Sequence, residues 1–187
     1  MTNNSQSLTL EEQREEYKKR RFLAMPIAGT IAWLAVGVCA FFLPQYVLVW
    51  VLFGATGMIV YMGMFISKFT GENFTDKNQP KNEFMDLFMQ TLVMSLLVYA
   101  IAIPFFIQDH TSLPLTVGIL TGLMWVPMTW SIQHWAPMAH GIARTVLVTI
   151  AWFALPEQRF TVIPFIIVVL YLWVIMVMEK RYKLANA

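Results

Sequence analysis

The chain has 187 residues, of which 58% are apolar and 13% charged, with a mean hydropathy of +0.59 and a formal net charge of +2. This composition excludes an ordinary soluble domain, because soluble domains of this size carry far more charge. The single cysteine, Cys39, excludes a disulfide framework or a thiolate metal cage within one chain. The basic residues flank apolar segments, so we expect no nucleic-acid partner.

The first 25 residues are polar and predict a cytoplasmic segment with a juxtamembrane helix. Thr9 and Glu12 have the spacing of a capping box, which predicts a surface helix over residues 10–25. The basic run 18–21 follows, and we expect it to meet the lipid headgroups. The segment does not have the pattern of a cleavable signal peptide, so we expect the first apolar block to stay in the protein.

Six apolar blocks follow, each of about the 20 residues that a helix needs to cross the hydrocarbon core. The predicted spans are 26–43, 46–67, 85–107, 113–132, 134–155 and 159–178. Backbone groups inside lipid must be paired within their own segment, so the predicted fold class is an all-α bundle of six transmembrane helices. The predicted organisation is an N-terminal segment 1–25, a membrane domain 26–178 and a cytoplasmic tail 179–187.

The basic residues also predict the orientation of the chain. Five of the thirteen Lys and Arg precede the first span, three lie in the loop 68–84 and three follow the last span. The positive-inside rule therefore places both termini in the cytoplasm, which requires an even number of spans. Asp109 and Glu157 fall in short outer loops, where we expect them to be solvated and dispensable.

The most informative residue is Arg144, about ten residues into the fifth span, where a charge costs several kcal/mol. On the predicted helix, Gln133, Pro137, His140 and Arg144 fall within about 60° of one another, forming a polar stripe that opens toward the cytoplasm. None of the eleven carboxylates lies deep in a span. Arg144 must therefore be satisfied by polar side chains, freed carbonyls, water or a bound anion.

Two further elements are expected to complete a binding site around this stripe. Asp86 and Gln90 share a face at the cytoplasmic end of the third span, and we expect that face to meet Arg144. Trp130 is one of several tryptophans near the turn between the fourth and fifth spans that would supply an aromatic wall. The predicted ligand-binding residues are Arg144, His140, Gln133, Gln90, Asp86 and Trp130.

The same sequence predicts no catalytic residues, metal site or cofactor. His134 and His140 lie about 240° apart around a helix, so they do not form a two-histidine metal pair. Ser95 lies in mid-span on a face without a base. Gly118 and Gly122 form a G-x-x-x-G motif, which favours close helix packing either within the bundle or at the seam of a homodimer.

One stretch resembles a known pattern. The run His140-Gly-Ile-Ala-Arg144-Thr, followed by Trp152, Pro156-Glu-Gln-Arg159-Phe and Pro164, is similar to a pattern in small multi-pass bacterial membrane proteins without known activity. The resemblance covers about a third of the chain. It implies a location in the bacterial inner membrane and no particular activity.

The leading hypothesis is a small transporter or channel-like protein with a cytoplasm-facing polar vestibule, in which Arg144 and His140 bind an anionic or amphipathic small molecule or a lipid headgroup. His140 matters because a neighbouring cation disfavours its protonation and an entering anion favours it. One alternative is a membrane enzyme that acts on a lipid-like substrate. Another is a structural or regulatory subunit whose basic face docks a partner. A cavity that reaches Arg144 would separate these hypotheses.

Overall fold

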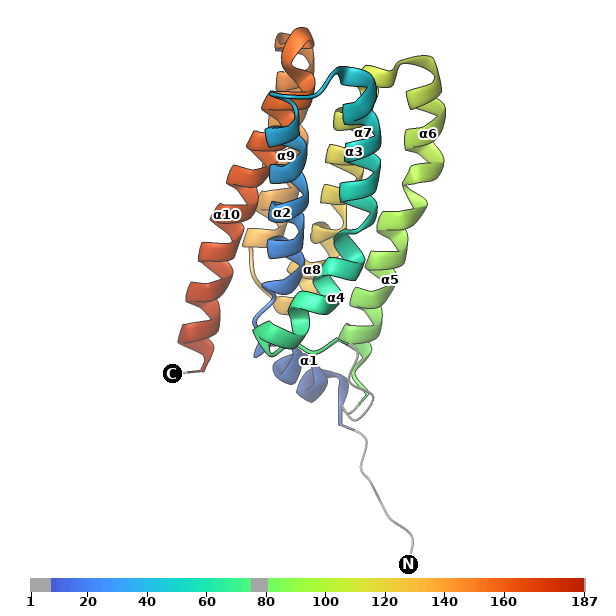
Figure 1. The fold of residues 1–187 in the computed structure, drawn as a ribbon. Coiled ribbons are helices and arrows are strands. Elements are labelled where there is room, and N and C mark those ends of the chain that lie inside the picture. Colours follow the sequence, from blue (N-terminus) through green and yellow to red (C-terminus); the bar gives the residue numbers. More distant parts are fainter. Residues whose placement is uncertain (1–7, 75–80, 187) are drawn as a thin grey trace, which may run out of the picture.

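The computed structural model describes residues 8–74 and 81–186, and the regular elements among them are all helical. A short helix, α1 (Leu10–Lys18), lies across one end of a bundle of long helices (Figure 1). The bundle comprises α2 (Ala24–Cys39), α3 (Gln45–Gly57), α4 (Ile59–Thr70), α5 (Glu83–Leu97), α6 (Tyr99–Gln108), α7 (Leu113–Leu123), α8 (Trp125–Ile132), α9 (Ala136–Ala154) and α10 (Arg159–Ala185). Two short 3-10 turns, His110–Ser112 and Pro156–Gln158, join helices at the opposite end. The predicted all-α class is confirmed.

In three predicted spans the regular α-helix is interrupted at a single residue, and one of the three is sharply bent there. Met58 separates α3 from α4, Val98 separates α5 from α6, and Met124 separates α7 from α8. The first pair is bent by 44°. Pro127, near the start of α8, has no N–H to offer the preceding turn, which helps to explain the third interruption.

Several helical stretches can cross a membrane by length and composition. Within the described residues these are Glu83–Gln108, His110–Ile132 and Pro156–Ala185, and the bent pair α3–α4 makes a fourth if it counts as one span. α2 is apolar but has only 16 residues. The surface of the bundle is also apolar, since many large apolar side chains, such as those of Trp50, Phe69 and Phe153, are exposed on it.

The core is centred on α10, which packs against α2 and α9. Trp33 of α2 and Ile163 and Ile167 of α10 are completely buried in it. Small residues allow neighbouring helices of the bundle to approach closely. Gly118 faces Ile167 and Val148 within the chain, and Gly122 faces Arg144, so the G-x-x-x-G motif serves internal packing.

The capping box at Thr9 is confirmed, because Glu12 N–H donates to Thr9 Oγ1 and Thr9 N–H donates to the Glu12 carboxylate. The predicted length of this helix is wrong, since α1 ends at Lys18 rather than near residue 25. Arg181 donates to the carbonyls of Lys18 and Arg20, which fixes the chain in a turn there. Those carbonyls are satisfied by α10 and not by a continuing helix.

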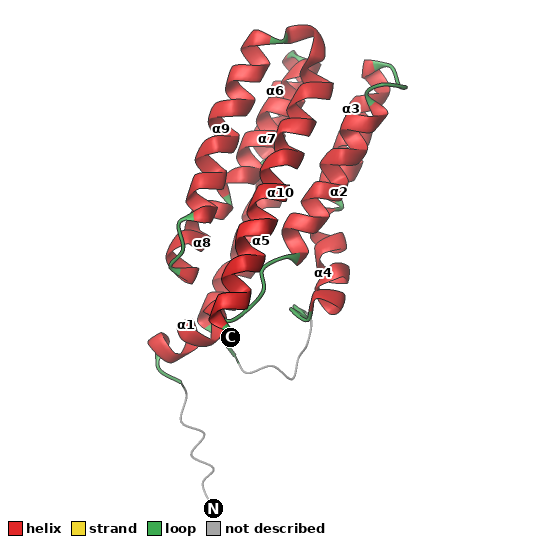
Figure 2. Ribbon diagram, turned by 90° about the vertical axis from the view of Figure 1, so that its left-hand side faces the viewer, coloured by secondary structure: helices red, strands yellow, loops and turns green. Residues whose placement is uncertain are grey.

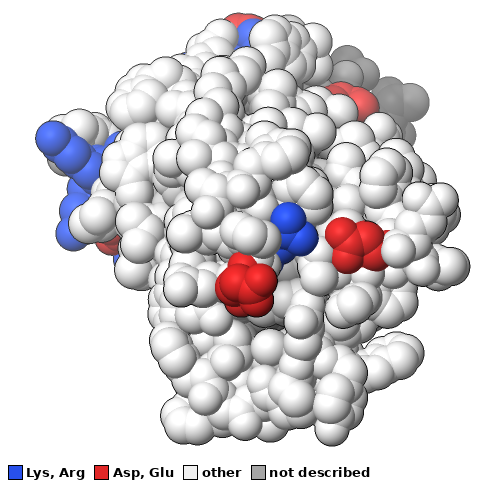
Figure 3. Space-filling view, turned by 90° about the horizontal axis from the view of Figure 1, so that it is seen from above, with Lys and Arg blue, Asp and Glu red and all other residues white. Residues whose placement is uncertain are grey.

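The C-terminal end of α10 therefore lies at the same end of the bundle as α1 (Figure 1). Arg21 strengthens this connection through two hydrogen bonds of 2.8 Å to the Glu179 carboxylate. The opposite end, seen in Figure 3, is mostly uncharged. Charge is thus concentrated around α1 and the end of α10.

Asp109 lies in the turn between α6 and α7, as expected, and it also takes part in a network of hydrogen bonds there. Its carboxylate accepts hydrogen bonds from the side chain and the backbone N–H of Thr111, at 2.9 and 2.8 Å, and these bonds lower the pKa of Asp109 from its usual value. The Thr111 hydroxyl accepts a further bond from Arg159, whose guanidinium lies 3.9 Å from the Trp152 ring centroid. Glu157 is exposed, as expected.

Candidate functional site

The central feature of the core is the side chain of Arg144, which is completely buried. Its Nη1 donates to the Tyr171 hydroxyl and its Nη2 to the Thr121 hydroxyl, each at 2.9 Å. The guanidinium carbon also lies 5.6 Å from the centroid of the Trp33 ring and 5.3 Å from that of Tyr171. Arg144 thus connects α9 to α7 and α10 while it faces two aromatic rings, an arrangement that stabilises a cation.

Two glycines make room for the side chains of Arg144 and Tyr171. A Cβ atom at Gly122 would lie 2.7 Å from Cδ and 3.1 Å from Nε of Arg144. A Cβ atom at Gly29 would lie 2.5 Å from Cζ of Tyr171. Neither position can carry a side chain without displacing the residue that faces it, so both glycines shape the site.

Several polar atoms near Arg144 are buried without a hydrogen-bond partner. They include three donors, Nε of Arg144 and Nε1 of Trp33 and of Trp125, and both ring nitrogens of His140. The His140 ring lies 5.2 Å from the Trp125 ring and 5.1 Å from the Tyr171 ring. The Leu170 carbonyl on α10 interacts with the imidazole, in a geometry too poor for a regular hydrogen bond. The core therefore offers more donors than acceptors.

This excess of donors is not balanced by a carboxylate. In the described part of the chain, Arg144 forms no ion pair, and its hydrogen bonds run only to hydroxyl groups. A guanidinium does not lose its proton in proteins, so the positive charge stays in the core. A buried charge without a counter-charge costs several kcal/mol, which makes this centre attractive for an anion.

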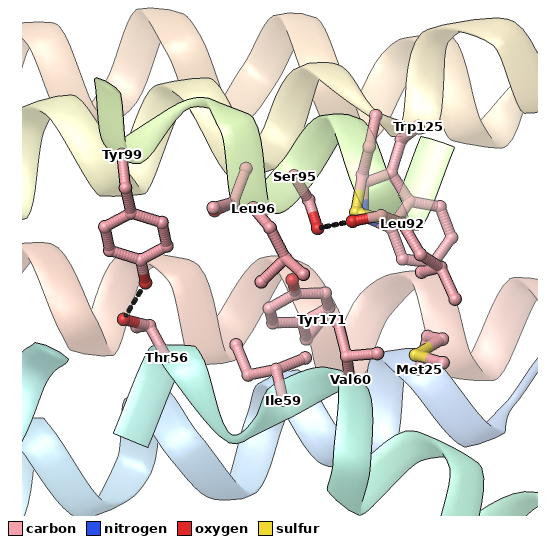
Figure 4. Close-up of a pocket in the computed structure, with 12 residues that line it drawn as sticks. Met25, Thr56, Ile59, Val60, Leu92, Ser95, Leu96, Tyr99, Trp125 and Tyr171 are labelled. Atoms are coloured by element: carbon pink, nitrogen blue, oxygen red, sulfur yellow. Dashed lines mark hydrogen bonds between the residues drawn. The ribbon is translucent and has the colours of Figure 1, made fainter. Parts of the chain in front are cut away.

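Thr121 and Tyr171, whose hydroxyls bind Arg144, line a cavity. Figure 4 shows Tyr171 in its wall. The cavity offers about 30 Å³ to the centres of water-sized groups, which is room for about two such groups. Its wall comes from the three helix interruptions and from α2 and α10, and consists of Met25, Thr56, Ile59, Val60, Leu92, Ser95, Leu96, Tyr99, Thr121, Met124, Trp125 and Tyr171. The cavity thus forms where α3–α4, α5–α6 and α7–α8 are each divided.

Most hydroxyl hydrogens around the cavity are already used. Thr56, Ser95 and Thr121 each donate to a carbonyl of their own helix. The Thr56 hydroxyl is therefore the acceptor for Tyr99, at 2.6 Å (Figure 4). Tyr171 differs, because its oxygen accepts from Arg144 and its own hydrogen has no assigned acceptor. An arginine that donates to this oxygen also polarises its O–H bond, so Tyr171 is the strongest hydroxyl donor facing the cavity.

Two further hollows continue from this cavity toward the end of the bundle where α1 lies. A narrow apolar gap of about 10 Å³ shares Met25, Met124 and Trp125 with the cavity and extends to Glu72. Glu72 also lines an open polar hollow of about 360 Å³, whose other members are Glu16, Lys19, Arg20, Arg21, Thr70, Gly71 and Tyr182. The three hollows form a row from a charged end of the molecule to its centre.

The structure brings only two of the six predicted site residues together, His140 and Arg144. Gln133 is not on α9, which begins at Ala136; it ends α8 in a left-handed conformation and accepts a hydrogen bond from Lys18. The stripe expected to continue from Arg144 to Gln133 is therefore wrong. Trp130 is exposed, and the centroid of its ring lies 4.5 Å from the guanidinium carbon of Arg14.

Asp86 and Gln90 are exposed on α5, and the hydrogen bonds of Arg144 run to α7 and α10 instead of to their face. The expected meeting of these two faces is wrong, because the guanidinium turns toward the hydroxyls of Thr121 and Tyr171. Sequence reasoning did not single out either hydroxyl. One signal for Tyr171 was available, since it stands in the middle of the otherwise apolar segment 162–178.

These features define a class: an all-helical protein with several helices able to cross a membrane and a buried basic centre beside a cavity. The chain belongs to a family described as "Family of unknown function (DUF7010)", which matches residues 10–181. This agrees with the resemblance to a family without known activity. No curated protein and no solved structure matches the chain.

Proposed function

We propose that the chain is a six-span protein of the bacterial inner membrane that binds a small anion beside Arg144 and moves it across the bilayer, as a transporter or channel-like protein. One observation carries this proposal. The completely buried Arg144 has no carboxylate partner among the described residues, and both of its hydrogen-bond partners line a cavity.

The six-span topology is supported by the course of the helices. α2, α3–α4, α5–α6, α7–α8, α9 and α10 run between two ends of one bundle (Figures 1 and 2). α1 and the end of α10 are held together by Arg181 and lie at the end rich in Lys and Arg. The positive-inside rule assigns that end to the cytoplasm.

The size and chemistry of the cavity favour a small monovalent anion. Room for about two water-sized groups suits a halide ion or a short carboxylate such as formate. The Tyr171 hydroxyl would donate to it, and Trp125, whose Nε1 is buried and unpaired, is a second donor in the wall. Arg144 would stabilise the anion from behind Tyr171 without direct contact.

Transport is favoured over simple binding by the bend between α3 and α4 and by the row of hollows. Transporters commonly bind their substrates near mid-membrane where helices are discontinuous, because irregular backbone within lipid is tolerated at cavities. The polar hollow around Lys19 and Arg21 opens at the proposed cytoplasmic end. It would act as the vestibule, with the side chains of Met25 and Met124 closing the narrow gap beyond it.

One alternative retains specific support. The hydrogen bonds of Arg144 link α7, α9 and α10, so its role could be to fasten the bundle without binding a ligand. A membrane enzyme has less support. No carboxylate lines the described cavity, and Ser95 donates to a backbone carbonyl instead of to a base.

The test is the thermal stability of the purified protein in detergent with sodium salts at constant ionic strength. Chloride, bromide and formate should raise the melting temperature in a saturable way, while gluconate, which is too large, should not. The Arg144→Gln variant should lose this response. Arg159→Gln serves as the matched control, because it removes the same charge far from the cavity and should keep the response.

A second step measures anion flux in proteoliposomes, in which the wild type should admit the same anions that stabilise it. If no anion stabilises the wild type, and Arg144→Gln simply melts at a lower temperature, the fastening role is correct instead. Stabilisation without flux would leave a binding protein and exclude a transporter.

A further inference from the structure

We propose that anion binding at this centre is coupled to protonation of His140, so that the protein takes up an anion together with a proton. This inference rests on the proposed function and adds its coupling ion. It stands on the position of a buried titratable group that anion binding by Tyr171 and Trp125 does not itself use.

His140 has no contact with solvent and no hydrogen-bond partner on either nitrogen. Its ring packs against the rings of Trp125 and Tyr171, whose centroids lie 6.2 Å apart, and both of those residues also line the cavity. An anion held by Tyr171 and Trp125 is thus separated from the imidazole by no more than these two side chains. An imidazole buried beside Arg144 carries a desolvation cost that an apolar side chain would avoid.

The charged and titratable groups that face His140 are few. On α9 it is Arg144, one turn away, and on α10 it is Tyr171; α8 contributes the neutral Trp125. No carboxylate is hydrogen-bonded to the imidazole in the described part of the chain. In the empty site, protonation of His140 would place two positive charges side by side in a medium of low dielectric, which is strongly unfavourable.

A bound anion reverses this balance. One negative charge beside Arg144 and His140 reduces the repulsion, so the imidazole can accept a proton on its free nitrogen. By linkage, the proton favours the anion as much as the anion favours the proton. The step transfers one proton from water to His140 and forms no covalent bond. One anion and one proton bound together leave the net charge of the protein unchanged, which lowers the cost of carrying the anion through the bilayer.

The experiment measures chloride binding by thermal stabilisation between pH 5 and 8, with gluconate balancing the ionic strength. Chloride is the probe because it does not titrate. In the wild type, the dissociation constant should rise with pH by up to about tenfold per unit, the slope for one linked proton. In a weakly buffered solution, saturation with chloride at constant pH should consume up to one proton per protein.

Two variants separate the sources of pH dependence. His140→Gln should bind chloride with little pH dependence and without proton uptake. His110→Gln removes an exposed histidine that lines none of the three hollows and should retain both effects. Chloride binding in the wild type without proton uptake, or an unchanged pH slope in His140→Gln, would overturn the coupling and leave the proposed function intact. Failure of the wild type to bind any of the small anions would overturn both.

Discussion

At the scale of single residues, the sequence identified the buried polar groups of the site but not the hydroxyl groups that bind Arg144. Arg144 and His140 were predictable because a charge and an imidazole in an apolar helix must be satisfied somehow. Tyr171 was not, because its ring makes it look like one more core residue on α10. Gln133 was assigned to the wrong helix, since nothing in its residue type indicates the left-handed conformation that it adopts.

Tyr171→Phe tests the inferred role of the hydroxyl. It leaves a buried N–H of Arg144 unpaired, so we expect a loss of about 1–3 kcal/mol in the free energy of unfolding. It also removes the free donor, so stabilisation by chloride should disappear. Thr121→Val is the control, because it unpairs Arg144 in the same way but removes a hydroxyl whose hydrogen is already used. If both variants lost the chloride response equally, Tyr171 would not be the donor.

Gly122→Ala tests the space left for Arg144. A Cβ atom would lie 2.7 Å from Cδ of Arg144, so the side chain must move, and we expect a loss of about 1–3 kcal/mol. At Gly118 the nearest atom is the flexible end of Ile167, at 3.3 Å. Gly118→Ala should therefore cost less, which thermal denaturation in detergent can measure. Equal losses of stability in the two variants would show that the Arg144 side chain can move aside more easily than its contacts indicate.

At the scale of elements, the lengths of the apolar blocks predicted the helices, while their ends and interruptions depended on contacts from distant residues. α1 ends where Arg181 donates hydrogen bonds to the carbonyls of Lys18 and Arg20, which would accept backbone N–H groups in a longer helix. The start of α2 is likewise set from elsewhere, because the Glu72 carboxylate accepts hydrogen bonds from the N–H groups of Leu23 and Ala24 at 2.8 and 2.9 Å. Neither contact is visible in a local pattern.

Glu72 predicts a pH dependence of stability. Burial raises the pKa of Glu72 above its ordinary value, although its hydrogen bonds to Leu23 and Ala24 act in the opposite direction. Between the ordinary and the raised pKa, the folded state binds more protons than the unfolded state, so stability falls as the pH rises through that window. Glu72→Gln should flatten this part of the pH profile while keeping the cap. An unchanged profile in that variant would contradict the assignment.

Asp109 and Glu157 test the outer loops. Asp109→Ala removes the acceptor that holds Thr111, and loss of such a cap costs about 0.5–2 kcal/mol. Glu157→Ala changes an exposed side chain and should stay within about 0.5 kcal/mol. Chemical denaturation of both variants in parallel gives the comparison. Equal and small effects would show that the network of Asp109, Thr111 and Arg159 is not stabilising.

At the scale of the whole molecule, the apolar composition and the low share of charged residues predicted the all-α class. The distribution of the basic residues along the chain predicts that the end with α1 faces the cytoplasm. The central cavity could not be predicted, because it forms where three helices are interrupted next to one another. Met58, Val98 and Met124 carry no sequence signal strong enough to place those interruptions.

The proposed topology predicts the accessibility of single cysteines in a Cys39→Ala background. A cysteine at position 157 should react with an impermeant thiol reagent added to intact cells, whereas one at position 81 should react only after the membrane is permeabilised. Both positions are exposed in the structure, so burial does not confuse the result. The reverse pattern would invert the orientation, and labelling of both from outside would exclude the three spans proposed between these two positions.

The most direct test of the central claim is an experimental structure of the protein in sodium bromide, with bromide located by its anomalous scattering. We predict a bromide peak in the cavity, within hydrogen-bond distance of the Tyr171 hydroxyl, and its absence in Arg144→Gln prepared in the same way. A wild-type structure with bromide on its surface and none in this cavity would contradict the claim that the buried guanidinium serves an anion.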